Sequence, residues 1–249
     1  MPALLWLLFW LKEDCHPEPK KRIFLTFLAG AGVIPIVFLI EYGLLKFFAY
    51  FNLATMNSYP VFLIFIYAGV EEYFKYYAAK KAALEKKDFD EPIDAIIYLI
   101  TAALGFAALE NILFIFKEFT DRGLTEGLLS GNLRFLGASL VHVVSSGFIG
   151  ASIAFSLFSP LRKSLPWLQF KTDPPQAQIE EIANEVKKEH LKRNVLIGFI
   201  LAALLHGFFN YFIMNSEENI FRIFLTVWIF AVIIIYLFER LKQDANQRI

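Results

Sequence analysis

The stretch YAGVEEYFKYYAAKKA, residues 67–82, places Glu71, Glu72 and Lys75 inside an otherwise apolar run. A long uncharged segment precedes the first glutamate. Charges at the centre of a membrane helix cost free energy unless they meet partners inside the protein. If this segment crosses a membrane, the rest of the chain must therefore supply those partners.

The composition is that of a polytopic membrane protein. The 249 residues are 57% hydrophobic and 19% charged, whereas soluble domains are about 45–50% apolar and about 25% charged. Several apolar runs approach the ~20 residues that span ~30 Å of hydrocarbon. A formal net charge of zero gives no electrostatic basis for binding nucleic acid. A single cysteine, Cys15, excludes an intrachain disulfide.

We predict an all-α transmembrane helical bundle that forms a single domain over residues 1–249, with six full spans. Apolar runs bounded by polar or turn residues place the spans at 23–40, 59–80, 92–117, 131–158, 194–214 and 219–239.

Two further helices are expected outside these spans. Residues 1–11 are apolar but too short to cross as a helix, so 1–22 should form a short N-terminal helix and a cytoplasmic loop. In segment 159–193, Pro174 and Pro175 precede apolar residues at helical spacing. This pattern fits an amphipathic helix on the inner membrane surface, or a solvated connector.

Basic residues predict the orientation. Segments 12–22, 80–91, 159–193 and 240–249 hold eighteen Lys and Arg, and the alternate segments hold two. Since cytoplasmic loops carry the excess of Lys and Arg, these four segments and the C-terminus should be cytoplasmic. The expected location is the cell membrane.

Five ionisable residues on four predicted spans share one depth, between the midplane and the outer half of the membrane. They are Glu71, Glu72, Glu110, His142 and His206. Because each would cost ~2.5–3.5 kcal/mol against lipid, we expect them to face one another or a wet cavity. Asn111 adjoins Glu110, and Asn210 lies one helical turn after His206.

The residues leave two kinds of chemistry open. His142, His206 and a carboxylate, Glu72 or Glu110, could hold a zinc ion, because two histidines and a glutamate form a known catalytic zinc set. Without a metal, a glutamate could activate water while histidine and asparagine donate to an oxyanion.

Neighbouring residues are expected to support such a site. Lys75 can pair with either adjacent glutamate, or extend its ammonium toward the inner surface. Asp94 fits a charge at a helix N-terminus. Small residues at 105, 147, 150 and 207 should let the helices approach closely.

Four motifs resemble, in order, those of the PrsW family of intramembrane proteases, which is related to the CAAX prenyl endoproteases. They are VEEYFKY at 70–76, DAIIYLITAALGFAALENILF at 94–114, RFLGASLVHVVSSGFIG at 134–150 and LLHGFFNYF at 204–212. The segment CHPEPKKR at 15–22 is similar to the loop after that family's first helix.

The resemblance implies an intramembrane endopeptidase that acts on a membrane-anchored protein, such as a single-span anti-sigma factor. It implies catalytic roles for Glu71, Glu72, His142, His206 and Asn210, with Lys75, Glu110 and Asn111 in support. The family is usually called a metalloprotease. Two other functions fit midplane charges, a proton-coupled carrier and a non-catalytic scaffold or immunity-type protein. Many carriers have paired halves, and this sequence shows no internal repeat.

Overall fold

The computed structural model describes residues 17–51, 59–87, 89–123, 125, 137–158, 176–215 and 220–246, and these residues contain no strand. The elements are α2 (Lys20–Gly32), α3 (Ile34–Tyr50), α4 (Tyr59–Ala79), the π-helical turn η2 (Lys80–Leu84), α5 (Pro92–Arg122), α7 (Ala138–Phe158), α9 (Gln176–Asn215) and α10 (Ile220–Asn246). The predicted all-α class is therefore confirmed for the described residues.

The first half of α5 is the centre of the bundle. Every residue from Pro92 to Ala107 is buried, and α5 contacts α2, α4, α7 and α10. A helix that is apolar on all sides is typical of such a position. The Asp94 carboxylate accepts hydrogen bonds from the backbone N–H groups of Asp90 and Glu91, at 3.0 and 2.7 Å. Asp94 thus caps the helix start, as its position near the N-terminus predicted.

Glycines allow the helices to approach closely around α5. A Cβ atom on Gly30 of α2 would lie 1.9 Å from the Ala102 carbonyl oxygen, and one on Gly105 of α5 would lie 1.9 Å from that of Phe27. A Cβ on Gly150 of α7 would lie 2.7 Å from Ala95 O on α5. Only glycine fits at such contacts, which bring α2 and α7 against α5 and so fix the framework of the site.

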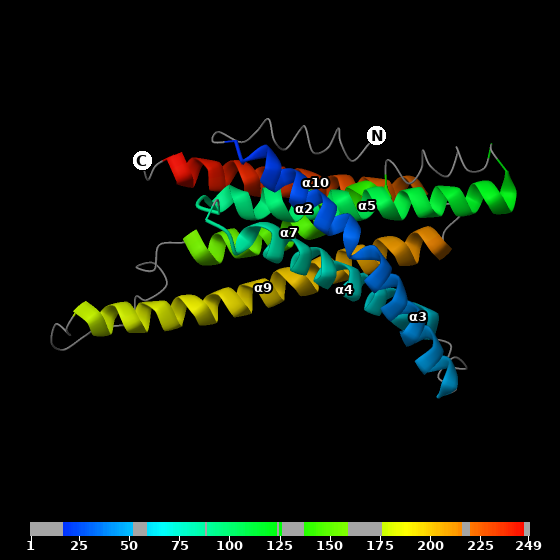
Figure 1. Ribbon diagram of the computed structural model, residues 1–249, viewed down its shortest axis with the longest axis horizontal. Helices are drawn as coiled ribbons and strands as arrows, with labels where there is room; N and C mark the ends of the chain where they lie inside the picture. Colours follow the sequence, from blue (N-terminus) through cyan, green and yellow to red (C-terminus); the bar gives the residue numbers. More distant parts are fainter. Residues whose placement is uncertain are drawn as a thin grey trace.

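Helices α2 and α3 form one apolar stretch that is interrupted at Val33. Pro35 lies in the first turn of α3, where it lacks the N–H that would continue the α2 hydrogen-bond pattern. Figure 1 shows α2 crossing the bundle and α3 leaving it beside the start of α4. The span predicted at 23–40 is therefore part of a longer apolar stretch, Lys20–Tyr50, which consists of two helices.

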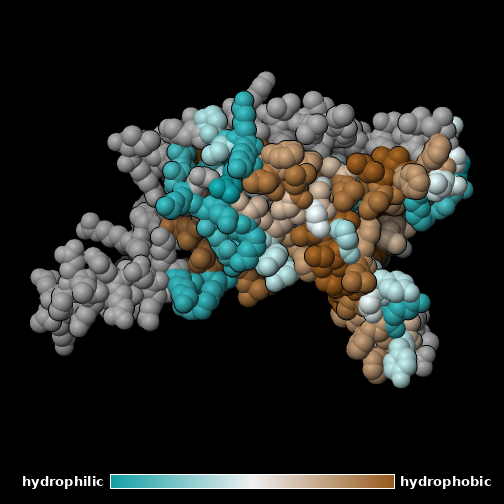
Figure 2. All heavy atoms as spheres, viewed as in Figure 1, coloured by the Kyte–Doolittle hydropathy of each residue, from teal (hydrophilic) through white to brown (hydrophobic). Residues whose placement is uncertain are grey.

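The surface is consistent with a membrane. Among the described residues, four helical stretches are long and apolar enough to cross one: Lys20–Tyr50, Pro92–Arg122, Ala138–Leu157 and Leu191–Met214. Hydrophobic residues cover the middle of the face in Figure 2, and hydrophilic ones gather where α2 begins and where α5 ends. The protein is thus a multi-pass helical membrane protein.

The segment before the span at 194–214 differs from the prediction. Helix α9 is one continuous helix of 40 residues from Gln176 to Asn215, so the helix expected within 159–193 is an extension of the span at 194–214. It is not a separate helix lying on the membrane, because no helix-breaking residue separates the two parts of α9. The predicted helix at 1–11 and the start of the span at 131–158 lie outside the described residues.

Candidate active site

Four helices bring the predicted polar residues together. Glu71 and Glu72 lie on α4, Glu110 on α5, His142 on α7 and His206 on α9. The rings of His142 and His206 are 4.7 Å apart between centroids and are nearly perpendicular. Residues far apart in the sequence therefore share one buried cluster, as their common depth led us to expect.

Glu72 is the most completely bonded member of the cluster. Its Oε1 accepts hydrogen bonds from Lys75 Nζ at 2.5 Å, Ser145 Oγ at 2.8 Å and His206 Nδ1 at 2.9 Å. Its Oε2 accepts one from Ser146 Oγ at 2.9 Å. A fully buried carboxylate with these partners is held in one orientation and links α4 to α7 and α9.

Lys75 points into the cluster, and the alternative that its ammonium extends to the inner surface is wrong. The side chain is fully buried. Its Nζ donates to Glu72 and lies 2.8 Å from His142 Nδ1, and it sits 5.0 Å from the centre of the Phe106 ring. These three partners replace the water that an exposed ammonium would bind.

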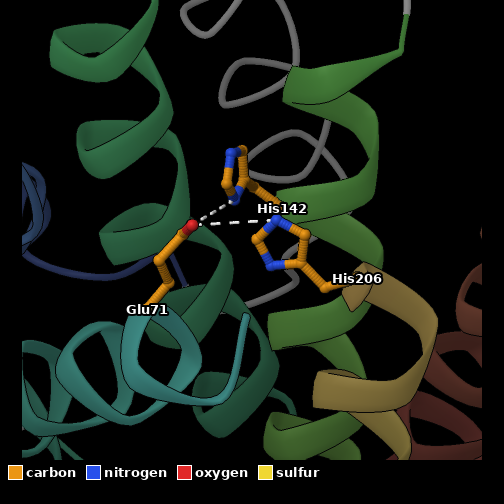
Figure 3. Close-up of side chains that lie close together, drawn as sticks. All are labelled: Glu71, His142 and His206. Atoms are coloured by element: carbon orange, nitrogen blue, oxygen red, sulfur yellow. Dashed lines mark ion pairs between the residues drawn. The ribbon is translucent and has the colours of Figure 1, made fainter. Parts of the chain in front are cut away.

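Glu71 contrasts with its neighbour. Its Oε2 is buried and makes no hydrogen bond with any described residue. It faces both histidines, 3.9 Å from His142 Nδ1 and 3.7 Å from His206 Nε2, as Figure 3 shows. Both distances are too long for hydrogen bonds, so this oxygen faces the two imidazoles without being bonded to either.

The same three side chains fit a metal ion. One ligand atom each from Glu71, His142 and His206 lies within 4.8 Å of the others, and all three residues are buried. A glutamate and two histidines are a common donor set for catalytic zinc, and the unpartnered Glu71 Oε2 is the kind of atom that an ion would satisfy. Glu72 and Glu110, the carboxylates that the sequence suggested as ligands, are not in this group.

In each histidine, the ring nitrogen that points away from Glu71 contacts another carboxylate. His206 Nδ1 is bonded to Glu72, and His142 Nε2 lies 3.1 Å from Glu110 Oε2. A carboxylate on the far side of an imidazole fixes the ring orientation and strengthens the near nitrogen as a ligand. Glu110 therefore belongs to the site as a support of His142.

The two asparagines take different positions. Asn111 donates from Nδ2 to Ser139 Oγ at 2.9 Å, which ties α5 to α7 beside the cluster. Asn210 is half-buried one turn beyond His206, and its amide makes no hydrogen bond to the described members of the cluster. The structure thus places Asn210 one helical turn from His206 without a hydrogen bond to the described members of the cluster.

The sequence prediction missed Glu41 on α3. This partly buried carboxylate is close enough to interact electrostatically with Glu110, Lys75 and Glu71. Tyr67 of α4 donates a hydrogen bond from its hydroxyl to the Glu41 carbonyl oxygen at 3.1 Å. The sequence does show Glu41 as an isolated acid in an apolar run, but the predicted first span ended one residue before it.

The described residues thus form a helical membrane bundle that buries a glutamate and two histidines in one cluster. Residues 18–171 match the family described as "PrsW family intramembrane metalloprotease". This match covers more than half of the chain, and the chain belongs to the PrsW family. It is an intramembrane protease.

Individual relatives agree with the family match. The chain is 25% identical to the protease PrsW of Clostridioides difficile over 239 residues, which cover 95% of this chain and 82% of the relative. It is 26% identical to the protease PrsW of Oceanobacillus iheyensis over 246 residues, covering 98% and 94%. The protease PrsW of Bacillus subtilis is 26% identical over 161 residues, covering 64% and 67%. No solved structure matches the chain.

Proposed function

We propose that the protein hydrolyses a peptide bond of a membrane-anchored protein at the point faced by Glu71, His142 and His206. The observation that carries this proposal is the buried Glu71 Oε2, which has no hydrogen-bond partner among the described residues and faces both imidazoles. A carboxylate left without a partner at such depth costs stability, so a catalytic use explains why it is there.

In this proposal the adjacent glutamates have separate roles. Without a metal, Glu71 would accept the proton of the attacking water, because its Oε2 has no other donor among the described residues. Glu72 is a positioning residue, because two serines, Lys75 and His206 already occupy its oxygens. The sequence left this choice open.

The histidines have distinct positions as well. His206 donates from Nδ1 to Glu72, which leaves the Nε2 lone pair facing Glu71. His142 helps to position the water. In this tautomer His206 has no N–H left for the oxyanion that forms when water adds to the carbonyl, so the amide of Asn210, one helical turn further along α9, would donate to it.

The residues present fit the metal that the family description implies. Glu71, His142 and His206 would hold it, and a bound zinc ion would polarise the scissile carbonyl and lower the pKa of a water molecule. With Glu71 occupied in this way, Glu110 is the nearby carboxylate left to take the proton. Glu110 also keeps His142 oriented through Nε2.

We infer that the substrate is a single-span membrane protein, of which an anti-sigma factor is an example by resemblance to the family. A proton-coupled carrier or a scaffold would cleave no peptide bond at Glu71. The test is cleavage of a single-span reporter by the full chain reconstituted in liposomes. His206→Ala should abolish cleavage, whereas His190→Ala should not, because it lies ~24 Å away along α9. Equal cleavage by the two variants would contradict the proposal.

A further inference from the structure

The ammonium of Lys75 occupies a ring nitrogen that a metal ion would need. Lys75 Nζ lies 2.8 Å from His142 Nδ1. An ammonium has only donors, so Nδ1 must accept with its lone pair, and the ring proton must then be on Nε2. Nε2 faces Glu110 Oε2 at 3.1 Å, which agrees with this assignment. The lone pair that faces the cluster is therefore already in use.

The Lys75 ammonium is held firmly in this position. Lys75 is fully buried, and its Nζ also donates to Glu72 Oε1 at 2.5 Å and lies over the Phe106 ring. Glu72 is itself fixed by Ser145 and Ser146 of α7. Moving the ammonium away from His142 would therefore disturb a buried network that joins α4 to α7.

The other two potential ligand atoms, Glu71 Oε2 and His206 Nε2, are not occupied in this way. Glu71 Oε2 has no hydrogen-bond partner among the described residues, and His206 Nε2 faces it at 3.7 Å. A divalent ion at this cluster would find one carboxylate oxygen and one imidazole nitrogen free. It would compete with Lys75 for the third ligand.

We propose that Lys75 caps His142 Nδ1 and competes with divalent cations at the Glu71–His142–His206 cluster. The site thus contains a cation of its own, and this lowers its affinity for metal. The inference uses the geometry of the proposed active site but does not depend on the proposed hydrolysis. Lys75 acts through His142 and is a positioning residue.

The test is the affinity of the full chain in detergent for Zn²⁺ and Co²⁺, measured by competition with a chromogenic chelator. Methionine is unbranched and close in length to lysine, so Lys75→Met removes the ammonium with little change in packing. We expect Lys75→Met to bind at least about tenfold more tightly than the wild type, which corresponds to ~1.4 kcal/mol. Lys75→Gln, which is too short to reach Nδ1, provides a second variant, and size-exclusion and helical circular dichroism check that each is folded.

A double-mutant cycle separates competition at His142 from the simple loss of a positive charge. In a His142→Ala background, Lys75→Met should give no gain in affinity, because the contested nitrogen is absent. A gain that persists in this background, equal affinity of Lys75→Met and wild type, or no binding by either would overturn the proposal. The cleavage assay on the same wild-type preparation reports separately on the proposed function.

Discussion

His206 Nδ1 lies 2.9 Å from Glu72 Oε1 across the contact between α9 and α4, and this bond turns the opposite nitrogen, Nε2, toward Glu71. One glutamate thus orients the histidine, and its neighbour faces the nitrogen that remains. Since adjacent residues on a helix point ~100° apart, this division of roles follows from the helical geometry of α4.

Glu72→Gln should destabilise the protein more than Glu71→Gln. The amide would place an NH₂ group among the donors that Glu72 now accepts from, and would remove the charge that strengthens those bonds. We expect a loss of about 2 kcal/mol for Glu72→Gln, read as a lower thermal unfolding temperature in detergent. Glu71→Gln should unfold near the wild-type temperature, because Oε2 has no hydrogen bond to any described residue that the change could remove. Equal destabilisation by the two changes would refute the assigned roles.

Gly105→Ala should weaken the contact between α2 and α5. The added methyl group would lie 1.9 Å from the backbone oxygen of Phe27, so the helices would have to separate. Overpacking of this kind costs about 1–3 kcal/mol. Gly43→Ala on the exposed side of α3 is the control, since its methyl group would meet nothing within 4 Å. Thermal unfolding of the two variants checks this, and a Gly105→Ala protein as stable as Gly43→Ala would show that the contact is not tight.

Much of the fold and part of the site could be predicted from the sequence. Apolar runs located the helices, and the cost of burying charge predicted that Glu71, Glu72, His142 and His206 would meet. The motif residue Gly105 indicated the close approach of α2 and α5 only in general terms, because sequence spacing does not identify the facing residue, Phe27.

Other features depend on contacts between distant segments, which the sequence does not contain. The direction of Lys75 is set by His142, which belongs to another helix. Ser145 and Ser146 of α7 donate to Glu72 and not to Glu71, and this decides which of the two glutamates is held by hydrogen bonds. Glu41 was missed because the predicted span ended at residue 40, whereas α3 continues to Tyr50.

Removal of metal should stop cleavage. Glu71, His142 and His206 fit an ion, and the chain belongs to a family described as metalloproteases. We expect exhaustive chelation of the purified protein to abolish cleavage of the reporter and added zinc to restore it. Full cleavage by protein shown by elemental analysis to contain no stoichiometric metal would exclude the ion and leave Glu71 to activate water by itself.

The C-terminus should be cytoplasmic. Segment 240–249 and the segments 12–22, 80–91 and 159–193 hold most of the Lys and Arg outside the predicted spans. A reporter that is active only in the cytoplasm, fused after Ile249, should therefore be active, and a periplasmic or extracellular reporter at the same site should not. The opposite pattern would reverse the inferred orientation and place the cluster nearer the inner face.

The most direct test of the central claim is the rate at which Glu71→Gln cleaves a single-span reporter under single-turnover conditions. The variant must be monodisperse and unfold at the wild-type temperature, so that lost activity is not lost structure. Because the carboxylate faces both histidines and has no other hydrogen-bond partner among the described residues, we predict at least a ~100-fold lower rate. A folded Glu71→Gln protein that cleaves within a few-fold of the wild-type rate would contradict the account.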